Sequence, residues 1–215
     1  MKYILLAIAT LLSFTSKSQT WKDFQYQNGD LLFQDLDCGP LCEAIEAVTP
    51  GLDNRHFSHV GIVYKPGDSV YVIEAYGKDV HITSINQFLE RQLDEKQQPK
   101  VVVGRIKTAY QKLNPRAVGF ALKQINKPYD DNFVSDNGKY YCSELVFEAY
   151  KDANNGFPFF NTYPMSFKDP KSKKTLTVWK QYFKALDQKI PEGKSGSSPG
   201  TIATNDNVEI VAAFY

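Results

Sequence analysis

Six short segments of the chain are rich in valine, isoleucine and aromatic residues, in alternating or continuous apolar runs. Such segments, bounded by turn-forming residues, are typical of β-strands. A turn signal, Pro66 and Gly67 between two charged residues, joins the second segment to the third and predicts a β-hairpin. The predicted strands are 30–34, 58–64, 69–76, 80–85, 101–106 and 208–214.

Other segments carry apolar residues at helical spacing. They predict helices over 40–48, 85–93, 114–125, 142–152 and 177–186. The helix over 142–152 places Leu145, Val146 and Ala149 on one stripe that would face a sheet. Most strands precede this helix, so the predicted class is α+β. Residues 187–205 are rich in Gly, Ser, Pro and Lys and predict a mobile loop.

The first 18 residues predict a signal peptide that is removed. Lys2 precedes an apolar run from Tyr3 to Phe14, and Ser16 and Ser18 suit the positions before a cleavage site. The apolar run is too short to span a bilayer comfortably. We therefore expect an exported protein, periplasmic or extracellular, with a single domain over 19–215 and no integral membrane segment after signal removal.

The net charge of +1 and the interspersed charges give no indication of a nucleic-acid partner. The charged clusters 168–174 and 91–100 are most simply solvated surfaces. His56 and His59 lie three apart, which on a strand points them to opposite faces, and no second ligand pair is evident. We therefore expect no metal, and nothing in the sequence indicates another cofactor.

Three cysteines in an exported protein leave one without a partner. Cys38 and Cys42 are four residues apart, with Gly39 and Pro40 between them. Because proline favours the first helical position, Cys38 is expected just outside a helix that contains Cys42, from where it could bend back to form a bridge. The hypothesis is a Cys38–Cys42 disulfide that leaves Cys142 free.

Cys142 begins a predicted helix, and His59 lies on a strand much earlier in the chain. The dipole and the unpaired N–H groups of a helix N-terminus stabilise a thiolate, which is the nucleophilic form of cysteine. A histidine that carries protons would complete the minimum requirement for acyl-transfer chemistry.

Glu74 is a candidate partner for this histidine. If Pro66 and Gly67 form the tip of the hairpin, paired residue numbers sum to 133, so that His59 lies opposite Glu74. Directly opposed side chains share a face of the sheet, with Cβ atoms about 4.5–5.5 Å apart. A carboxylate there would orient the imidazole, and a slip of one residue would separate the two.

A structural interpretation competes with the catalytic one. A cysteine at a helix start is often a small buried hydrophobic residue. A strand histidine and an edge glutamate can equally be structural, and His81 is expected at the surface. From the residues alone, both interpretations remain open.

The set GDLLFQ, FSHVGIVY, VIEAYG, KPYDDNF and YYCSELVFEAY resembles the permuted papain-like cysteine amidases of the YaeF/YiiX type, within the NlpC-type hydrolases. The resemblance spans about residues 30–150 and continues weakly through SSPGTIATND. It implies a circularly permuted papain-like fold, in which an antiparallel sheet or barrel packs against the nucleophile helix. In this family the histidine precedes the cysteine, as it does here.

The resemblance implies Cys142 as nucleophile, His59 as general base and acid, and Glu74 as the orienting group. It also implies Tyr129 as an oxyanion or substrate contact, since a Gly-x-Pro-Tyr stretch precedes the cysteine helix in unpermuted relatives. Asn126 here departs from that glycine. The run Tyr-Cys-Ser-Glu departs from the Asp-Cys-Ser-Gly of those relatives, which puts their peptidoglycan substrates in doubt for this chain.

The expected activity is hydrolysis of a peptide, aminoacyl or N-acyl amide through a thioester, with a substrate that could derive from the cell wall. Two alternatives remain. One is a lipid-directed thiol acyltransferase, whose acyl site could be lined by the aromatic run Phe157, Phe159 and Phe160. The other is an envelope protein that binds without catalysis.

Overall fold

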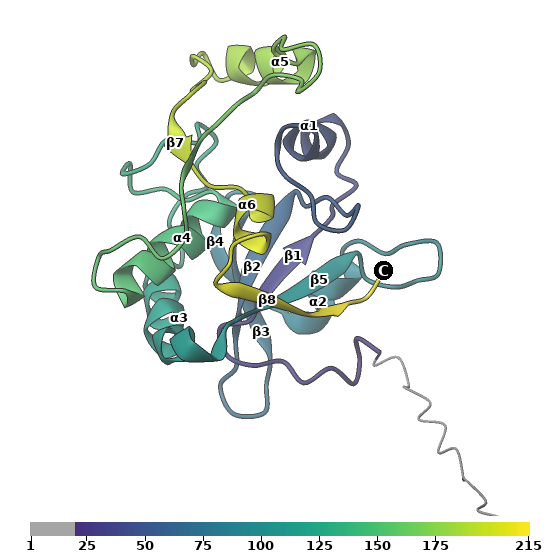
Figure 1. The fold of residues 1–215 in the computed structure, drawn as a ribbon, viewed down its shortest axis with the longest axis vertical. Coiled ribbons are helices and arrows are strands. Elements are labelled where there is room, and N and C mark those ends of the chain that lie inside the picture. The colour runs from purple at the N-terminus through teal and green to yellow at the C-terminus, as the bar shows by residue number, and fades with distance from the viewer. Residues whose placement is uncertain (1–19) are drawn as a thin grey trace, which may run out of the picture.

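A six-stranded antiparallel sheet organises the fold (Figure 1). The computed structural model describes residues 20–215, so the predicted signal peptide lies outside the described residues. In spatial order the strands are β4 (Asp79–Ser84), β3 (Tyr71–Tyr76), β2 (His59–Tyr64), β1 (Leu31–Gln34), β5 (Val101–Ile106) and β8 (Val208–Ala213).

Helices follow or interrupt these strands along the chain. They are α1 (Pro40–Val48), α2 (Ile85–Glu90), the 3-10 helix η1 (Thr108–Leu113), α3 (Asn114–Lys123), α4 (Cys142–Ala153), α5 (Thr177–Ala185) and α6 (Pro199–Ala203). The predicted α+β class is confirmed. Within the part of the chain that the structure describes, no helix is both long and apolar enough to cross a membrane.

The sheet is covered on both faces. On one face, α4 packs against β2, so that Leu145 and Val146 share a core with Val60 and Ile62. On the opposite face, Phe88 of α2 belongs to a second core. A sheet enclosed in this way holds β2 and β3 in a dry environment, where polar side chains need partners.

A segment from Tyr163 to Gly196 extends away from the sheet and its covering helices, which we call the body, and then returns to them. Its ends pair as the short strands β6 (Tyr163–Pro164) and β7 (Ser195–Gly196). We call the segment the cap. It includes α5 and, with α1, forms a third core around Trp179. In Figure 1 α5 lies at one end of the molecule and the β2–β3 turn lies at the other.

The β2–β3 register differs from the predicted one by two residues. Ile62 pairs with Ile73 and Tyr64 with Tyr71, so paired numbers sum to 135 rather than 133. The strands stop pairing at Tyr71, so Val70 belongs to the turn and Pro66 and Gly67 are not at its centre. A shift of two residues keeps every side chain on its predicted face, because the side-chain period of a strand is two.

The loop predicted over 187–205 is also corrected. It contains β7 and α6, and α6 is capped by Ser198, whose hydroxyl oxygen accepts a hydrogen bond from the Thr201 N–H at 3.1 Å. Ile202 is fully buried against the main core. The Gly, Ser and Pro residues of this segment therefore include a helix cap and buried positions, which composition alone does not distinguish from a loop.

Candidate active site

Cys142 occupies the first position of α4. Tyr141 before it has an extended backbone, and its carbonyl accepts the first helical hydrogen bond from the Leu145 N–H at 3.1 Å. The Cys142 thiol is free and buried, with 6% of the residue exposed. The first N–H groups of a helix have no acceptor within the helix, and their partial positive charge favours an anion at this position.

His59 lies at the start of β2, and its ring is buried between Tyr76 and Phe88, with ring centroids 5.2 and 5.8 Å away. Its Nε2 lies 2.6 Å from a carboxylate oxygen of Glu74. Burial lowers the pKa of His59, but hydrogen bonds to Cys142 and Glu74 outweigh it and raise the pKa to about 9. Because Nε2 faces Glu74, Nδ1 is the nitrogen that remains for the thiol.

Glu74 is fully buried, yet it is surrounded by donors. Arg91 donates to both carboxylate oxygens, at 2.9 and 2.6 Å, and Thr83 donates its hydroxyl to one of them. Burial raises the pKa of Glu74, but hydrogen bonds from His59 and Arg91 dominate and hold that pKa well below its usual range. Glu74 is therefore a fixed anion beneath the imidazole.

Arg91, expected at a solvated surface with its charged neighbours, instead belongs to the candidate site, because its side chain is only 18% exposed and pairs with Glu74. It ends α2, and its guanidinium lies over the Tyr76 ring, 4.1 Å from the ring centroid. In contrast, the residues of β4 that lie near Glu74 could have been predicted from the turn between β3 and β4. Gly77 and Lys78 form a two-residue turn that places His81 directly opposite Glu74 and brings Thr83 to a diagonal position. No pattern in the sequence marks Arg91.

A cavity of about 390 Å³ opens in front of Cys142. Part of its wall comes from Ile45 of α1 and from Met165, Phe167 and Trp179 of the cap. None of the described side chains that line it carries a charge. Its volume falls within the range of about 300–1,000 Å³ that is usual for small-molecule sites.

Tyr129 also lines this cavity. The backbone around it pairs with Tyr140, just before the cysteine helix, because Asp130 donates its N–H to the Tyr140 carbonyl at 3.1 Å. Burial and the adjacent Cys142 raise the pKa of Tyr129 well above its usual value. Its phenol is therefore a permanent proton donor at neutral pH, able to donate to an oxyanion.

The aromatic run after the cysteine helix does not line the cavity, contrary to the acyl-site interpretation. Phe159 and Phe160 are buried in the main core, where both contact Tyr150. Phe157 is 72% exposed. The run packs beneath α4, and the apolar wall of the cavity comes instead from α1 and the cap.

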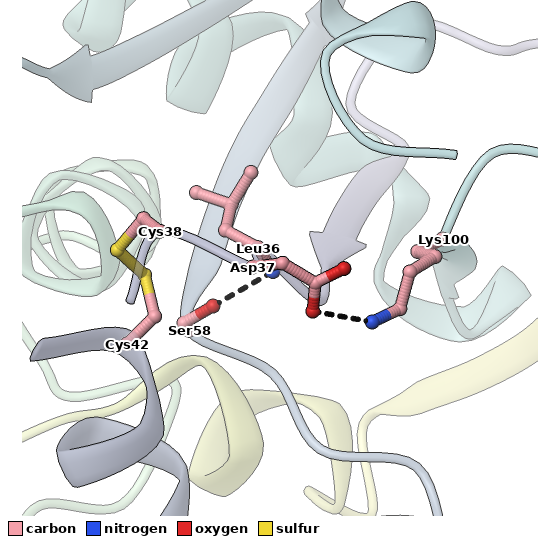
Figure 2. The surroundings of a disulfide bond; sticks show 6 residues. All are labelled: Leu36, Asp37, Cys38, Cys42, Ser58 and Lys100. Carbon is pink, nitrogen blue, oxygen red and sulfur yellow. Dashed lines mark hydrogen bonds and ion pairs between the residues drawn. A yellow bond between two sulfur atoms is a disulfide. The ribbon is translucent and has the colours of Figure 1, made fainter. Parts of the chain in front are cut away.

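The structure joins Cys38 and Cys42 in a disulfide, which links the turn after β1 to α1 (Figure 2). Beside it, the Leu36 N–H donates to the Ser58 hydroxyl at 2.9 Å. Ser58 lines the cavity and directly precedes His59. The disulfide therefore stands next to the backbone that carries the histidine and leaves Cys142 as the free thiol.

The site thus joins His59 and Glu74 to Cys142, which lines the apolar cavity together with Tyr129. Across residues 20–215, no group of three or more His, Cys, Asp and Glu side chains is arranged to hold a metal ion. Both oxygens of Glu74 already accept hydrogen bonds from Arg91, so they are not free to act as ligands.

Known proteins resemble this chain over most of its length. It is 28% identical over 153 residues to the uncharacterized protein YiiX of Escherichia coli K12, a match that covers 71% of this chain and 69% of that protein. The crystal structure of metalloprotein yiiX from Escherichia coli O157:H7 is similar in fold, with a TM-score of 0.69 and 23% sequence identity. That match covers 89% of this chain and 99% of the other.

A family model described as permuted papain-like amidase enzyme, YaeF/YiiX, C92 family, matches residues 25–212. This match confirms the resemblance and the permuted papain-like fold predicted from the sequence, and it accounts for a histidine strand that precedes the cysteine helix. The chain belongs to the YaeF/YiiX, C92 family of permuted papain-like amidases.

Proposed function

We propose that this protein is an exported cysteine hydrolase that cleaves an amide bond through a thioester on Cys142. The observation that supports it most is the 2.6 Å contact of His59 with a buried, fixed carboxylate, beside a free thiol at a helix N-terminus that helps to raise the pKa of His59. Nucleophile, proton carrier and orienting anion are the three parts of a catalytic triad.

Because the pKa of His59 is raised to about 9, its imidazole holds the proton at neutral pH, and in the first step the Cys142 sulfur attacks the substrate carbonyl carbon. The carbonyl oxygen becomes an oxyanion, with the Cys142 backbone N–H and the Tyr129 phenol as donors. The C–N bond then breaks as His59 returns its proton to the leaving amine. In the second step His59 removes a proton from water, the hydroxide attacks the thioester, and the thiol is reformed as the acid leaves.

The cavity supports a substrate with an uncharged, apolar acyl group. A charged group in this space would lose its hydration without gaining a described partner of opposite charge. The negatively charged peptides of the cell wall are therefore poorer candidates than N-acyl amides or amides of apolar amino acids.

Acyl transfer is the second candidate, and the same apolar cavity favours it. The two reactions share the thioester and differ only in what attacks it, either water or the hydroxyl or amine of an acceptor. Incubating the protein with a labelled N-acyl amide, with and without an added acceptor, would separate them, because a transferase gives labelled acceptor in place of the free acid.

The metalloprotein description of the Escherichia coli O157:H7 structure does not lead to a metal step here. A metal step would need a group of metal-binding side chains, and the described residues of this chain do not provide one. We therefore assign each step to the side chains of the chain itself.

The test is release of amine from a panel of uncharged N-acyl amides by the wild type, Cys142→Ala and Cys142→Ser. We expect turnover by the wild type alone, because a serine hydroxyl is a much weaker acid than a thiol and its shorter C–O bond draws the nucleophile away from His59. Equal turnover by Cys142→Ala would refute the proposal. Substrate binding without turnover by the wild type would favour the non-catalytic binding protein instead.

A further inference from the structure

The cap carries a charge opposite to that of the rest of the protein. Residues 163–196 contain eight lysines and three acidic residues, which gives a net charge of +5. The remaining described residues contain 15 Lys and Arg and 21 Asp and Glu, which gives a net charge of −6. The overall charge of +1 therefore conceals a strong separation of charge between one end of the molecule and its body.

The lysines of the cap are available to a partner. Seven of them are exposed: Lys171, Lys173, Lys174, Lys180, Lys184, Lys189 and Lys194. The eighth, Lys168, pairs with Glu192 at 3.3 Å. On α5 the buried residues Trp179 and Phe183 face the cap core, so Lys180 and Lys184 lie on its outer side.

The same segment forms a wall of the apolar cavity. Lys168 directly follows Phe167, which lines the cavity, and the Lys194 carbonyl accepts a hydrogen bond from the Met165 N–H at 2.8 Å. Two apolar residues of the cap, Tyr163 and Leu186, are also exposed, by 45% and 36%. A partner that settles on the lysines would therefore lie beside the cavity.

We propose that the cap docks the protein onto a bilayer containing anionic phospholipids. Clustered lysines are attracted to such a surface, each one contributing about fivefold in affinity. An anionic bilayer fits both features of the cap, since it offers negative headgroups to the lysines and apolar chains to the cavity. The negative body would be repelled by the same surface, which orients the protein with the cap toward the membrane.

This inference goes beyond the proposed hydrolase activity and does not depend on it. Binding to vesicles is measured without catalysis, whereas the hydrolase proposal is tested by turnover and by the Cys142 thiol. A protein that hydrolyses soluble amides but ignores vesicles would refute the docking surface alone. A protein that binds vesicles through the cap but has no turnover would refute the hydrolase alone.

The experiment is co-sedimentation with vesicles of phosphatidylcholine, with and without phosphatidylglycerol. The cap variant carries four substitutions: Lys171→Gln, Lys174→Gln, Lys180→Gln and Lys184→Gln. The matched control changes the net charge equally on the body: Lys78→Gln, Lys96→Gln, Lys112→Gln and Lys123→Gln, all at exposed lysines. All three proteins share residues 1–19, so any contribution of that segment is common to them.

We expect the wild type to bind the vesicles that contain phosphatidylglycerol at low salt and not to bind vesicles of phosphatidylcholine alone. The cap variant should bind at least about 100-fold more weakly, and the body control should stay within about fivefold of the wild type. At about 1 M salt, where the screening length falls to about 3 Å, binding should be lost.

Three results would overturn the proposal. The first is a wild type that does not bind anionic vesicles at low salt. The second is a body control that weakens as much as the cap variant, which would indicate a general effect of net charge. The third is equally tight binding of double-stranded DNA through the same lysines, which would make the cap a surface for nucleic acid or polyanions in general. Equal thermal melting of the three proteins would show that all are folded.

Discussion

Replacing Arg91 by methionine isolates the contribution of the residue that holds Glu74. The Arg91 side chain is 18% exposed and Glu74 is fully buried, so the variant leaves a buried carboxylate without its main partner. Breaking a buried pair in this way typically costs about 3–5 kcal/mol. His59 and Thr83 still donate to Glu74, and methionine keeps part of the packing on Tyr76, so we expect a loss of about 2–3 kcal/mol at neutral pH.

The loss should depend on pH. In the wild type the folded pKa of Glu74 is depressed, so its ionised form adds stability above the unfolded pKa of about 4.3 and loses it as pH falls through the folded value. Without Arg91 the folded pKa rises toward or above the unfolded one, and this contribution disappears. The difference in the free energy of unfolding between the wild type and Arg91→Met should therefore narrow as pH falls below about 4.

Urea denaturation gives the free energy of unfolding for Arg91→Met, Glu74→Gln and the double variant. The double-mutant cycle should show a coupling of at least about 1.5 kcal/mol. Arg116→Met is the matched control, because Arg116 pairs with Asp152 on the surface, where the side chains are 52% and 41% exposed. It should cost no more than about 0.5 kcal/mol. A loss in Arg91→Met no larger than in this control would refute the reasoning.

Three further outcomes are expected. Glu74→Gln should lower kcat by about 10²–10⁴-fold with little change in KM, if it orients the imidazole, and an unchanged kcat would remove Glu74 from the mechanism. His59, whose pKa is raised to about 9, should add stability that is fully present below about pH 6.5 and lost as pH rises through about 9, on the order of 3 kcal/mol, and His59→Gln should flatten this slope in urea titrations. Reducing the Cys38–Cys42 disulfide should cost about 2 kcal/mol by the loop-entropy model, measured as a lower melting temperature, and an unchanged melting temperature would contradict this.

Much of the fold could be predicted because local sequence and tertiary structure agree. Alternation and turn residues placed the six main strands within one or two residues, and helix α1 was predicted with its observed bounds. The hairpin register was wrong by two residues, because a turn signal marks where a chain reverses but not how many residues the turn holds. The contact of His59 with Glu74 survived, since an even shift preserves the face.

What the sequence could not provide was the set of residues supplied by distant segments. Arg91 reaches Glu74 from the end of a helix, and neither spacing nor periodicity links the two. The cavity is shaped by α1 and the cap, which meet through the contacts of α1 with α5. The aromatic run at Phe157 was a plausible alternative wall because composition cannot tell core packing from a pocket. The lysines of the cap were visible in the sequence. Only the fold shows that they lie at one end of the molecule, apart from the negatively charged remainder of the protein.

The central claim is that His59 activates the Cys142 thiol, and the alkylation rate of this thiol tests it most directly. Cys38 and Cys42 form the disulfide, so iodoacetamide reports on Cys142 alone. A free thiol reacts slowly below its pKa of about 8.5. We predict that near pH 6 the native protein is alkylated at least about tenfold faster than the urea-unfolded chain, and that His59→Gln abolishes this advantage. A native rate equal to or below that of the unfolded chain, or one unchanged in His59→Gln, would contradict the account.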